Sequence, residues 1–599
     1  MKIGNLICTT GLFNELYNPQ NLNSINEYKL ENFSSLFWKI ILDRNFVNYV
    51  VSLIDKTKEL SLWEKAVISD CKYFIDEVCD SHFEIYKQNL SEKDFFHYIE
   101  ILNIYTRLLS KYYFIDFKMD VQDGILFENT SAMKIYEKSL EDNFLKKFLC
   151  DNLLSKMDCE NLDLVWINGQ FTIVSAICIN YIKEKSPNCK FFLRNHSSEY
   201  FSLNKIENFL VRNTYLFKMI DGIVLDGNRD TFLTVEQTIF ENEKIFKIPN
   251  LIIKYGNEII QTLKKKKKFS PFDYLNFRDK GDSRKKYFSE HIINLRLFPL
   301  KRCYWRKCNF CGINNKYSYN YFSDETTTEF EFIKQLYKKG YKLFWFEDEA
   351  INKKDMISFA DYLLENDIKI KWQVRTRFDA FFTEKECLKL KDSGLAEIRF
   401  GYESASINVL KKMNKYEKDF DFARIEQSIL IFSKCGIHVH LPIIVGFPGE
   451  TKDERSKTYE TLKILKEKYN ISFNINLFLL DISSNVYKSF ADYNIPVIAY
   501  PTLPSDFLGN FIEYARDFNY KFIEQERNDF MRETLYPWYP ETALTKPVVF
   551  YRLCETIRNT LLWNSFELKE KNISHNTKFF HFEKEAIIYK WNDHQIIKD

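Results

Sequence analysis

Long apolar runs are absent from this sequence of 599 residues. A membrane-spanning helix needs about 18 or more consecutive apolar residues, and no uncharged stretch here approaches that length, so we expect no such helix. The first residues, Met1 to Cys8, contain too short an apolar run for a secretory signal. Net charge is also nearly absent, at +2 with 28% charged residues, which favours neither a nucleic-acid binder nor a disordered acidic tail.

Cysteine is too sparse for a disulfide scaffold, since 13 cysteines are spread over the whole chain. Clustered free thiols suit a reducing compartment, so we expect a cytoplasmic protein. Neither Cys nor His occurs between Gly312 and Glu386. This gap limits the ligands available to the one cysteine cluster, which lies just before it.

That cluster places Cys303, Cys308 and Cys311 within nine residues, after an apolar run at 292–300 that predicts a buried strand. Thiolates bind soft metals, and short spacings let one loop wrap one centre. The loop supplies three ligands and no obvious fourth. Structural zinc takes a closed set of four, whereas a 4Fe-4S cluster held by three cysteines leaves one iron open for another ligand.

Two alternatives to an iron-sulfur cluster remain at this loop. The thiols could be core cysteines that cluster without binding a metal. Zinc would need a distant fourth ligand, such as His291, Cys387 or Cys435. Of these readings, the open 4Fe-4S cluster fits the count of three best.

The loop resembles the cluster loop of the radical S-adenosylmethionine (radical SAM) enzymes, with an aromatic residue, Phe310, before the last Cys and Gly312 after it. The usual family spacing is C-x3-C-x2-C, and this chain has C-x4-C-x2-C, one residue longer in the first gap. The resemblance implies a 4Fe-4S cluster held by Cys303, Cys308 and Cys311. It also implies S-adenosylmethionine as cofactor, with Phe310 beside it.

Apolar segments alternate with helical patterns after the cysteines and predict six parallel strands with crossover helices. The strands are expected before Cys303 and at 343–349, 368–377, 396–404, 437–446 and 471–480. Six such units make a partial (β/α)6 barrel, whose active site lies at the C-terminal strand ends.

Further matches at these strand ends extend the resemblance over roughly residues 290 to 490. The resemblance implies an ammonium site at the second strand, a carboxylate partner on the third, a ribose and methionine contact on the fourth and an adenine contact after the fifth. Glu347, Asp348 and Glu349 are expected at the ammonium site, and Arg375 or Arg377 is expected at the carboxylate. Glu403 and Ser404 are expected at the ribose and methionine, and Gly446 and Pro448 at the adenine.

Each of these assignments has a structural alternative. An acidic strand end is often only solvated, and the two glycines of the family's second-strand motif are absent beside Glu347. The segment from Gly446 to Thr451 also fits a strand-to-helix turn capped by Thr451. Glu403 has a weaker alternative, because a Gly-Tyr-Glu-Ser run closing an apolar strand has little packing logic. No residue is assigned to catalysis on the substrate.

The N-terminal part divides near residue 155. Apart from one strand in the first ten residues, 1–155 is predicted to be helical, with helices at 36–42, 46–51 and 95–102. In 156–265, strands at 162–168, 189–193 and 222–227 alternate with helices, which predicts a parallel sheet with a ligand crevice at its strand ends. A hairpin is expected around Gly256 and Asn257.

This layout resembles the cobalamin-binding domain that precedes the barrel in one large class of radical SAM enzymes, and it implies cobalamin as a third cofactor. Two departures count against it. The Asp-x-His-x-x-Gly motif is absent, and the stretch from Asp226 to Asp230 retains at most one glycine of the expected turn. His196 is a conceivable axial ligand, against the alternative of an ordinary loop histidine.

The predicted fold class is therefore α/β. We expect a helical N-terminal region, a Rossmann-like domain of the cobalamin-binding type and a linker at 266–290, followed by a radical SAM core at 291–495 and a mixed C-terminal extension at 496–599 that closes the barrel over substrate. The resemblance implies reductive cleavage of S-adenosylmethionine for cobalamin-dependent C-methylation, or another radical modification, of a peptide or small natural product.

The expected partners are that substrate and an external electron donor such as a flavodoxin or ferredoxin, without nucleic acid or membrane. The alternative from another class is a non-catalytic iron-sulfur or zinc binding protein that retains the fold. Iron stoichiometry and formation of 5'-deoxyadenosine separate the two.

Overall fold

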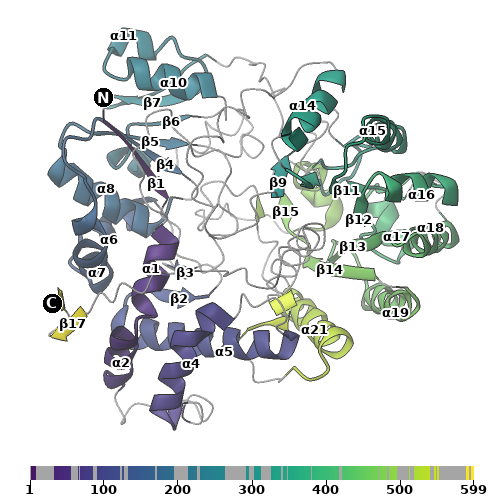
Figure 1. Cartoon of the computed structure of the whole chain (residues 1–599), viewed down its shortest axis with the longest axis horizontal. Helices are drawn as coiled ribbons and strands as arrows, with labels where there is room; N and C mark the ends of the chain where they lie inside the picture. The colour runs from purple at the N-terminus through teal and green to yellow at the C-terminus, as the bar shows by residue number, and fades with distance from the viewer. Residues whose placement is uncertain are drawn as a thin grey trace.

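The computed structural model describes residues 2–7, 33–54, 65, 68–84, 91–121, 124–126, 132–168, 171–194, 214–224, 229–263, 292–295, 303–311, 326–338, 341–346, 348–378, 381–416, 421–469, 471–481, 484–495, 511–512, 518–539, 545–547, 550–551, 589–592 and 595–598. Two six-stranded sheets organise them (Figure 1). In this part of the chain no helix is both long and apolar enough to cross a membrane.

The first sheet has the order β1-β4-β5-β6-β7-β8. Its strands are β1 (Ile3–Ile7), β4 (Leu164–Asn168), β5 (Lys190–Arg194), β6 (Gly222–Val224), β7 (Leu251–Tyr255) and β8 (Glu258–Gln261). The first four are parallel, as predicted, and α8 (Ile173–Lys185) between β4 and β5 confirms one βαβ unit. Between β5 and β6 the described residues contain the short 3-10 helix η5 (Thr214–Lys218). β7 and β8 are the predicted hairpin, turning at Gly256 with φ +58°.

Across this sheet the four parallel strands follow one another in chain order. A doubly wound sheet binds its ligand where the strand order reverses, and the described strands contain no such reversal. The loops that follow β4, β5 and β6, including His196 and Asp226, lie outside the described residues.

A largely helical region is inserted between β1 and β4. It contains α1 (Phe33–Ile41), α2 (Arg44–Ser52), α4 (Cys71–Glu84), α5 (Glu92–Leu108), η2 (Leu109–Tyr113), α6 (Ala132–Leu140), α7 (Phe144–Asn152) and η3 (Leu154–Lys156), with a small hairpin of β2 (Lys118–Asp120) and β3 (Gly124–Leu126). The helices expected at 36–42, 46–51 and 95–102 are confirmed, while the hairpin was not expected. β1 pairs in parallel with β4, so the first sheet includes a strand from the stretch that was assigned to the helical region. The sequence pattern did not predict this pairing, because the two strands lie more than 150 residues apart in the chain.

The second sheet has the order β14-β13-β12-β11-β10-β9, and every neighbouring pair is parallel. The strands are β9 (Ile292–Leu295), β10 (Leu343–Phe346), β11 (Lys371–Thr376), β12 (Leu395–Phe400), β13 (His438–Val445) and β14 (Ile471–Leu477). Six parallel strands in chain order confirm the partial (β/α)6 barrel. The helices between them are α14 (Thr326–Lys338), α15 (Lys353–Glu365), α16 (Glu384–Asp392), α17 (Ile407–Lys412), α18 (Phe422–Lys434) and α19 (Lys452–Lys468).

The two faces of this sheet differ in polarity. Side chains alternate along a strand, and Trp372, Val374 and their counterparts on neighbouring strands join the apolar core formed with the helices. The opposite face carries Gln373, Arg375, Glu397, Arg399, His438, His440, Ser472 and Asn474. The barrel therefore keeps its polar side chains on the face that the crossover helices do not cover.

Most of these polar groups satisfy one another. Arg399 Nε donates to Glu397 Oε1 at 2.6 Å, and its guanidinium lies 4.7 Å from the centre of the Trp345 ring. The ring of His440 bonds to Ser472 and Asn474, both at 2.8 Å. Burial, reinforced by Arg399, lowers the pKa of His440 to about 3, so this imidazole is neutral at physiological pH.

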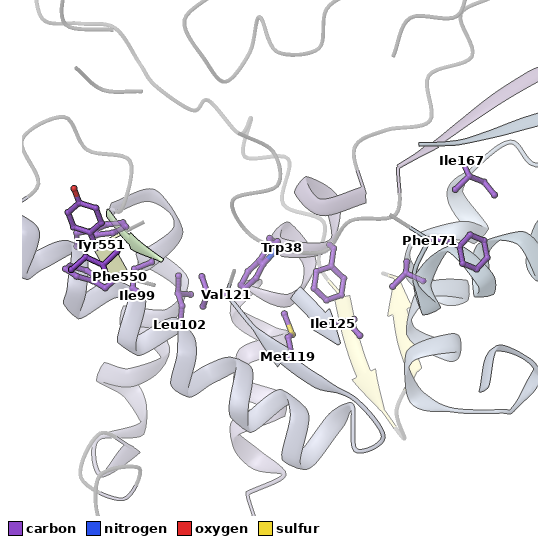
Figure 2. Packing of buried hydrophobic residues seen from close by; sticks show 14 of the residues in the cluster. Trp38, Ile99, Leu102, Met119, Val121, Ile125, Ile167, Phe171, Phe550 and Tyr551 are labelled. Atoms are coloured by element: carbon purple, nitrogen blue, oxygen red, sulfur yellow. The ribbon is translucent and has the colours of Figure 1, made fainter. Parts of the chain in front are cut away.

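The C-terminal segment connects the barrel to the helical insertion. α21 (Phe518–Leu535) packs on the barrel, where Phe530 stacks on Tyr459 with ring centres 4.5 Å apart. Farther along, Thr545 donates its backbone N–H to the Glu100 carboxylate of α5 at 2.9 Å. Phe550 joins the same contact, beside Ile99 and Leu102 (Figure 2). One stretch of chain thus bridges α5 and the last barrel strands.

Candidate functional site

The cysteine loop at 303–311 is held against the chain that follows α17. Asn309 donates its backbone N–H to Met413 O at 2.8 Å and its side-chain amide to Lys412 O at 3.0 Å. Trp305 Nε1 donates to Asn414 O at 2.8 Å, and Asn414 Nδ2 donates back to Lys307 O at 2.9 Å. These four bonds fix the loop against the C-terminal end of α17 and the two residues that follow it.

The extra residue in the first cysteine gap is accommodated by a left-handed turn. Arg306 has φ +57°, which is uncommon for a residue with a side chain. Its Nε donates to Cys303 O at 3.1 Å, closing the turn between the first two cysteines. Between the last two, Cys311 donates its N–H to Cys308 O at 3.2 Å. The longer spacing is therefore a defined turn in the loop.

The side chain of Arg377 contacts Cys308, the second of the three cysteines. It is 2% exposed, and its Nη1 lies 3.9 Å from Cys308 Sγ. Its guanidinium lies 4.3 Å from the centre of the Trp305 ring and 5.0 Å from that of Tyr416, and Nη2 donates to Lys415 O. Burial raises the pKa of the Cys308 thiol, while Lys415 and Arg377 act in the opposite direction.

A buried ion pair lies next to this group. Lys415 Nζ is 2.7 Å from Glu403 Oε1, and both side chains are at most 9% exposed. Burial alone would lower the pKa of Lys415, but Glu403 raises it above its usual value. Glu403 has φ +65° and is fastened to β13 on both sides, through Pro442 O and the Ile444 N–H. Such backbone strain persists only where surrounding contacts enforce it.

Of the other predicted residues, some lie beside Cys308, Arg377 and the Glu403–Lys415 pair, and the rest lie farther away. Phe310 is half-buried, with Lys415 Nζ 5.9 Å from its ring centre. Asp348 is buried and Glu349 half-buried after β10, whereas Glu347 lies outside the described residues. Ser404 is fully buried, and its hydroxyl accepts from the Ser406 N–H at 3.1 Å.

The two arginines predicted for one role occupy different places. Arg377 belongs to the group around Cys308. Arg375 is half-buried on the uncovered face of the sheet, in register with Arg399, and its guanidinium has no hydrogen bond or ion pair in the part of the chain that the structure describes. Of the two arginines, Arg375 is therefore the one whose donors are not taken up by the described residues.

The segment after β13 turns sharply into α19. Gly446 and Gly449 have φ +76° and +77°, conformations that favour glycine. Thr451 caps α19 in a reciprocal box with Glu454, as the structural alternative expected. Ile523 of α21 comes within 3.5 Å of the position of a Cβ on Gly446, so the C-terminal helix lies over this turn, while Pro448 is buried within it.

Glu450 closes the same turn by accepting the Gly446 N–H at 2.5 Å. Its other oxygen, Oε1, has no hydrogen-bond partner among the described residues. Burial raises the pKa of Glu450 to about 8, although the Gly446 N–H acts to lower it. The carboxyl group is therefore largely protonated at neutral pH.

This carboxyl group predicts a pH dependence of stability. An unfolded Glu titrates near about 4.3, so between that pH and about 8 the folded protein holds a proton that the unfolded chain releases. The free energy of unfolding should therefore fall by on the order of 5 kcal/mol as pH rises through this window, and it should level off above the window. Urea unfolding from pH 4.5 to 9 checks this against Glu450→Gln, in which the fall should vanish. An equal fall in both proteins would contradict it.

The donor set fits a 4Fe-4S cluster by its chemistry, because all three cysteines are free thiols on one loop. Their side chains do not converge as they stand: no group of three Cys, His, Asp or Glu among the described residues is arranged to hold a metal. The same finding counts against zinc completed by Cys387 or Cys435, whereas His291, the other candidate for the fourth ligand, lies outside the described residues. Binding a cluster would thus have to draw the thiols together, as is common when metal binding is coupled to folding.

Sequence reasoning missed the residues that support the loop, chiefly Trp305, Lys415 and Tyr416. They lie in stretches that carry the motif, but their pairing with Arg377 spans 38 to 72 positions and depends on how β11 and β12 are aligned. The one available signal was the aromatic and basic residues flanking the motif itself.

Comparison with known proteins matches part of the chain to one family model. The profile of the radical SAM superfamily matches residues 298–462. The tRNA-2-methylthio-N(6)-dimethylallyladenosine synthase of Clostridium tetani is 33% identical over 157 residues, which are 24% of this chain and 33% of that protein. An uncharacterized methyltransferase of Pyrococcus horikoshii is 27% identical over 168 residues, 27% of this chain and 35% of that protein. The chain thus spans about a third of the length of these curated relatives.

Solved structures resemble the chain more weakly. The radical S-adenosylmethionine methyltransferase TsrM from Kitasatospora setae, solved with cobalamin and a 4Fe-4S cluster, is 13% identical, with 62% of this chain and 76% of that chain covered and a TM-score of 0.42. The cobalamin-dependent S-adenosylmethionine radical enzyme OxsB, solved with aqua-cobalamin and S-adenosylmethionine, is 14% identical, with 71% and 69% covered and a TM-score of 0.43. Likeness at this level identifies no ligand of this chain.

Proposed function

We propose that this chain, whose residues 298–462 are a radical SAM domain, cleaves S-adenosylmethionine reductively and uses the resulting radical to modify a peptide or small natural product. The observation that carries the proposal is the cysteine loop, bonded to residues 412–414 at the end of a six-stranded parallel barrel and backed by Arg377. Active sites of such barrels lie at that end.

Cys303, Cys308 and Cys311 are the residues that would hold the 4Fe-4S cluster. When bound, a reduced cluster supplies one electron to the sulfonium, which breaks the bond from sulfur to C5' and yields methionine and a 5'-deoxyadenosyl radical that abstracts hydrogen from the substrate. The chain's own contribution is to position the reactants and exclude water. The buried Glu403–Lys415 pair and the α21 helix over Gly446 support such a closed site.

For S-adenosylmethionine itself, Arg375 is our choice to meet the carboxylate, since Arg377 is committed to the cysteine loop. Asp348 and Glu349 remain the candidates for the ammonium group. The Gly446 turn, with Pro448, is proposed to lie beside adenine. Ser404 is a less suitable ribose contact, because its hydroxyl is buried and bonded within the protein.

Arg375→Gln is expected to weaken binding of S-adenosylmethionine by about 10- to 100-fold, since a hydrogen bond to a charged group contributes about 1.5–3 kcal/mol. Equilibrium dialysis on the reconstituted protein measures this. Arg424→Gln is the control, because Arg424 is exposed on α18, on the helical side of the barrel. An unchanged dissociation constant for Arg375→Gln would remove this arginine from the site.

Methyl transfer is the modification we propose first, provided that the protein retains a corrinoid. The N-terminal sheet is the candidate domain, but its described strands contain no order reversal and the chain has no Asp-x-His-x-x-Gly motif. The loops that follow β4, β5 and β6 lie outside the described residues, and the described residues of this sheet supply no cobalamin ligand, so no step is derived through cobalamin. Without a corrinoid, the same radical would serve epimerisation, crosslinking or rearrangement.

The test is anaerobic reconstitution with iron and sulfide, reduction with dithionite in the presence of S-adenosylmethionine, and assay of 5'-deoxyadenosine, with and without added cobalamin. We expect about four iron atoms per chain and formation of 5'-deoxyadenosine. Corrinoid that remains after gel filtration would support the methylation branch. Zinc in place of iron, with no 5'-deoxyadenosine, would overturn the proposal in favour of a non-catalytic binding protein.

A further inference from the structure

Arg377 is one of two buried cations at the cysteine loop, the other being Lys415, and it lies outside the cysteine motif. Its Nη1 lies 3.9 Å from Cys308 Sγ, and the residue is 2% exposed. The contact is well fixed, because Trp305 and Tyr416 lie 4.3 and 5.0 Å from the guanidinium carbon and Nη2 is bonded to Lys415 O. Such a side chain cannot turn towards a ligand without leaving all of these contacts.

Three features suit this arginine to stabilise negative charge on Cys308 sulfur. A guanidinium is always charged and presents several N–H donors in a fixed plane. The surroundings are buried, since Cys308 is 7% and Arg377 2% exposed, and charges interact more strongly where water is excluded. The neighbouring Lys415, in contrast, is paired with Glu403 at 2.7 Å.

Hydrogen bonds to cysteine sulfur and local charge are among the means by which a protein sets the reduction potential of an iron-sulfur cluster. Reduction adds one electron to the buried site, from an external low-potential donor, without a proton. A cation at the sulfur stabilises the reduced state more than the oxidised state. Removing it should therefore lower the midpoint potential.

We propose that Arg377 is a positioning residue that raises the reduction potential of the cluster bound at Cys308, and that it does not bind S-adenosylmethionine. This inference rests on the proposed function, since it requires a 4Fe-4S cluster at the three cysteines. It assigns the two arginines of β11 and its C-terminal end to separate tasks: Arg375 to the ligand and Arg377 to the cluster.

The experiment is a redox titration of reconstituted protein, in which the reduced cluster is counted by its electron paramagnetic resonance signal. Arg377→Gln should give at least about a tenfold lower ratio of reduced to oxidised cluster at a fixed solution potential, which is about 59 mV for one electron. The midpoint potential of Arg377→Lys, which keeps the charge, should lie between those of Arg377→Gln and the wild type.

Arg399→Gln is the matched control, because Arg399 is also stacked on a tryptophan, Trp345, but contacts Glu397 instead of a cysteine. Its potential should equal that of the wild type.

The outcomes separate this inference from the function beneath it. A wild-type protein without the cluster signal would refute the proposed function. A wild-type signal with the same potential in Arg377→Gln would refute the inference alone. Loss of the cluster from both Arg377 variants would also refute it, because the arginine would then serve the folding of the loop and not the potential. Dialysis with S-adenosylmethionine gives the last check: weaker binding in Arg377→Lys at an unchanged potential would return Arg377 to the ligand site.

Discussion

Cys308→Ala is expected to reduce 5'-deoxyadenosine formation by on the order of 1000-fold or more and to leave the reconstituted protein without its 4Fe-4S absorbance. Cys308 is the buried, central thiol of the loop, and it is the one in contact with Arg377. Loss of one of three thiolates leaves too few protein ligands to hold the cluster, an effect larger than the 10- to 100-fold typical of residues that only support a ligand. The measurements are iron content, visible absorbance and 5'-deoxyadenosine under reduction.

Cys435→Ala is the matched control. Cys435 is a free cysteine that caps the C-terminal end of α18 in the barrel, away from the cysteine loop. This variant should keep both the cluster and the activity. The same variant tests the alternative of a zinc site, because a zinc ion that had Cys435 as its fourth ligand would be lost from it. Cluster-dependent activity that persists in Cys308→Ala would contradict the assignment of the loop.

Loss of one partner of the Glu403–Lys415 pair should lower the free energy of unfolding by about 3–5 kcal/mol, because the remaining charge is left buried without its counterion. Both side chains are at most 9% exposed and lie 2.7 Å apart. The two single variants are Glu403→Gln and Lys415→Met. Urea unfolding, followed by far-UV circular dichroism, measures the cost of each.

The double variant Glu403→Gln/Lys415→Met distinguishes a cost of isolated charge from a cost of lost packing. If isolated charge dominates, the double variant should be more stable than the sum of the single effects predicts. Strict additivity would mean that the two side chains do not interact energetically. The same variants should alter the cysteine loop, since Lys415 Nζ lies 5.9 Å from the centre of the Phe310 ring in that loop.

The sequence alone was sufficient for the features that depend on local pattern. The alternation of apolar segments and helices located all six barrel strands, and the predicted hairpin at Gly256 is present. Helix ends followed from capping residues such as Thr451, whose hydroxyl and partner Glu454 lie within one turn. These features could be predicted because their interactions join residues close together in the chain.

Residues at the candidate site were harder to place. The three cysteines, Glu403 and the Gly446 turn stand out as motifs, yet the sequence offered Arg375 and Arg377 as equivalent choices. They lie two positions apart, but Arg375 belongs to the uncovered face of β11, whereas Arg377 follows the strand and packs under the loop. The alternation of side chains applies only within a strand, so it could not predict where the side chain of Arg377 lies.

What the sequence by itself determined was thus the chemistry: three thiols in one loop, a parallel barrel behind them, and carboxylates, arginines and glycines at its strand ends. Only the tertiary structure decided which of these groups meet. It joined β1 to β4 across the helical insertion, paired Lys415 with Glu403, brought Arg377 to Cys308, and placed α21 over Gly446. The physical reason is that these contacts link residues far apart in the chain or beyond the end of a strand, where packing of the whole fold, and not local periodicity, sets the position of each side chain.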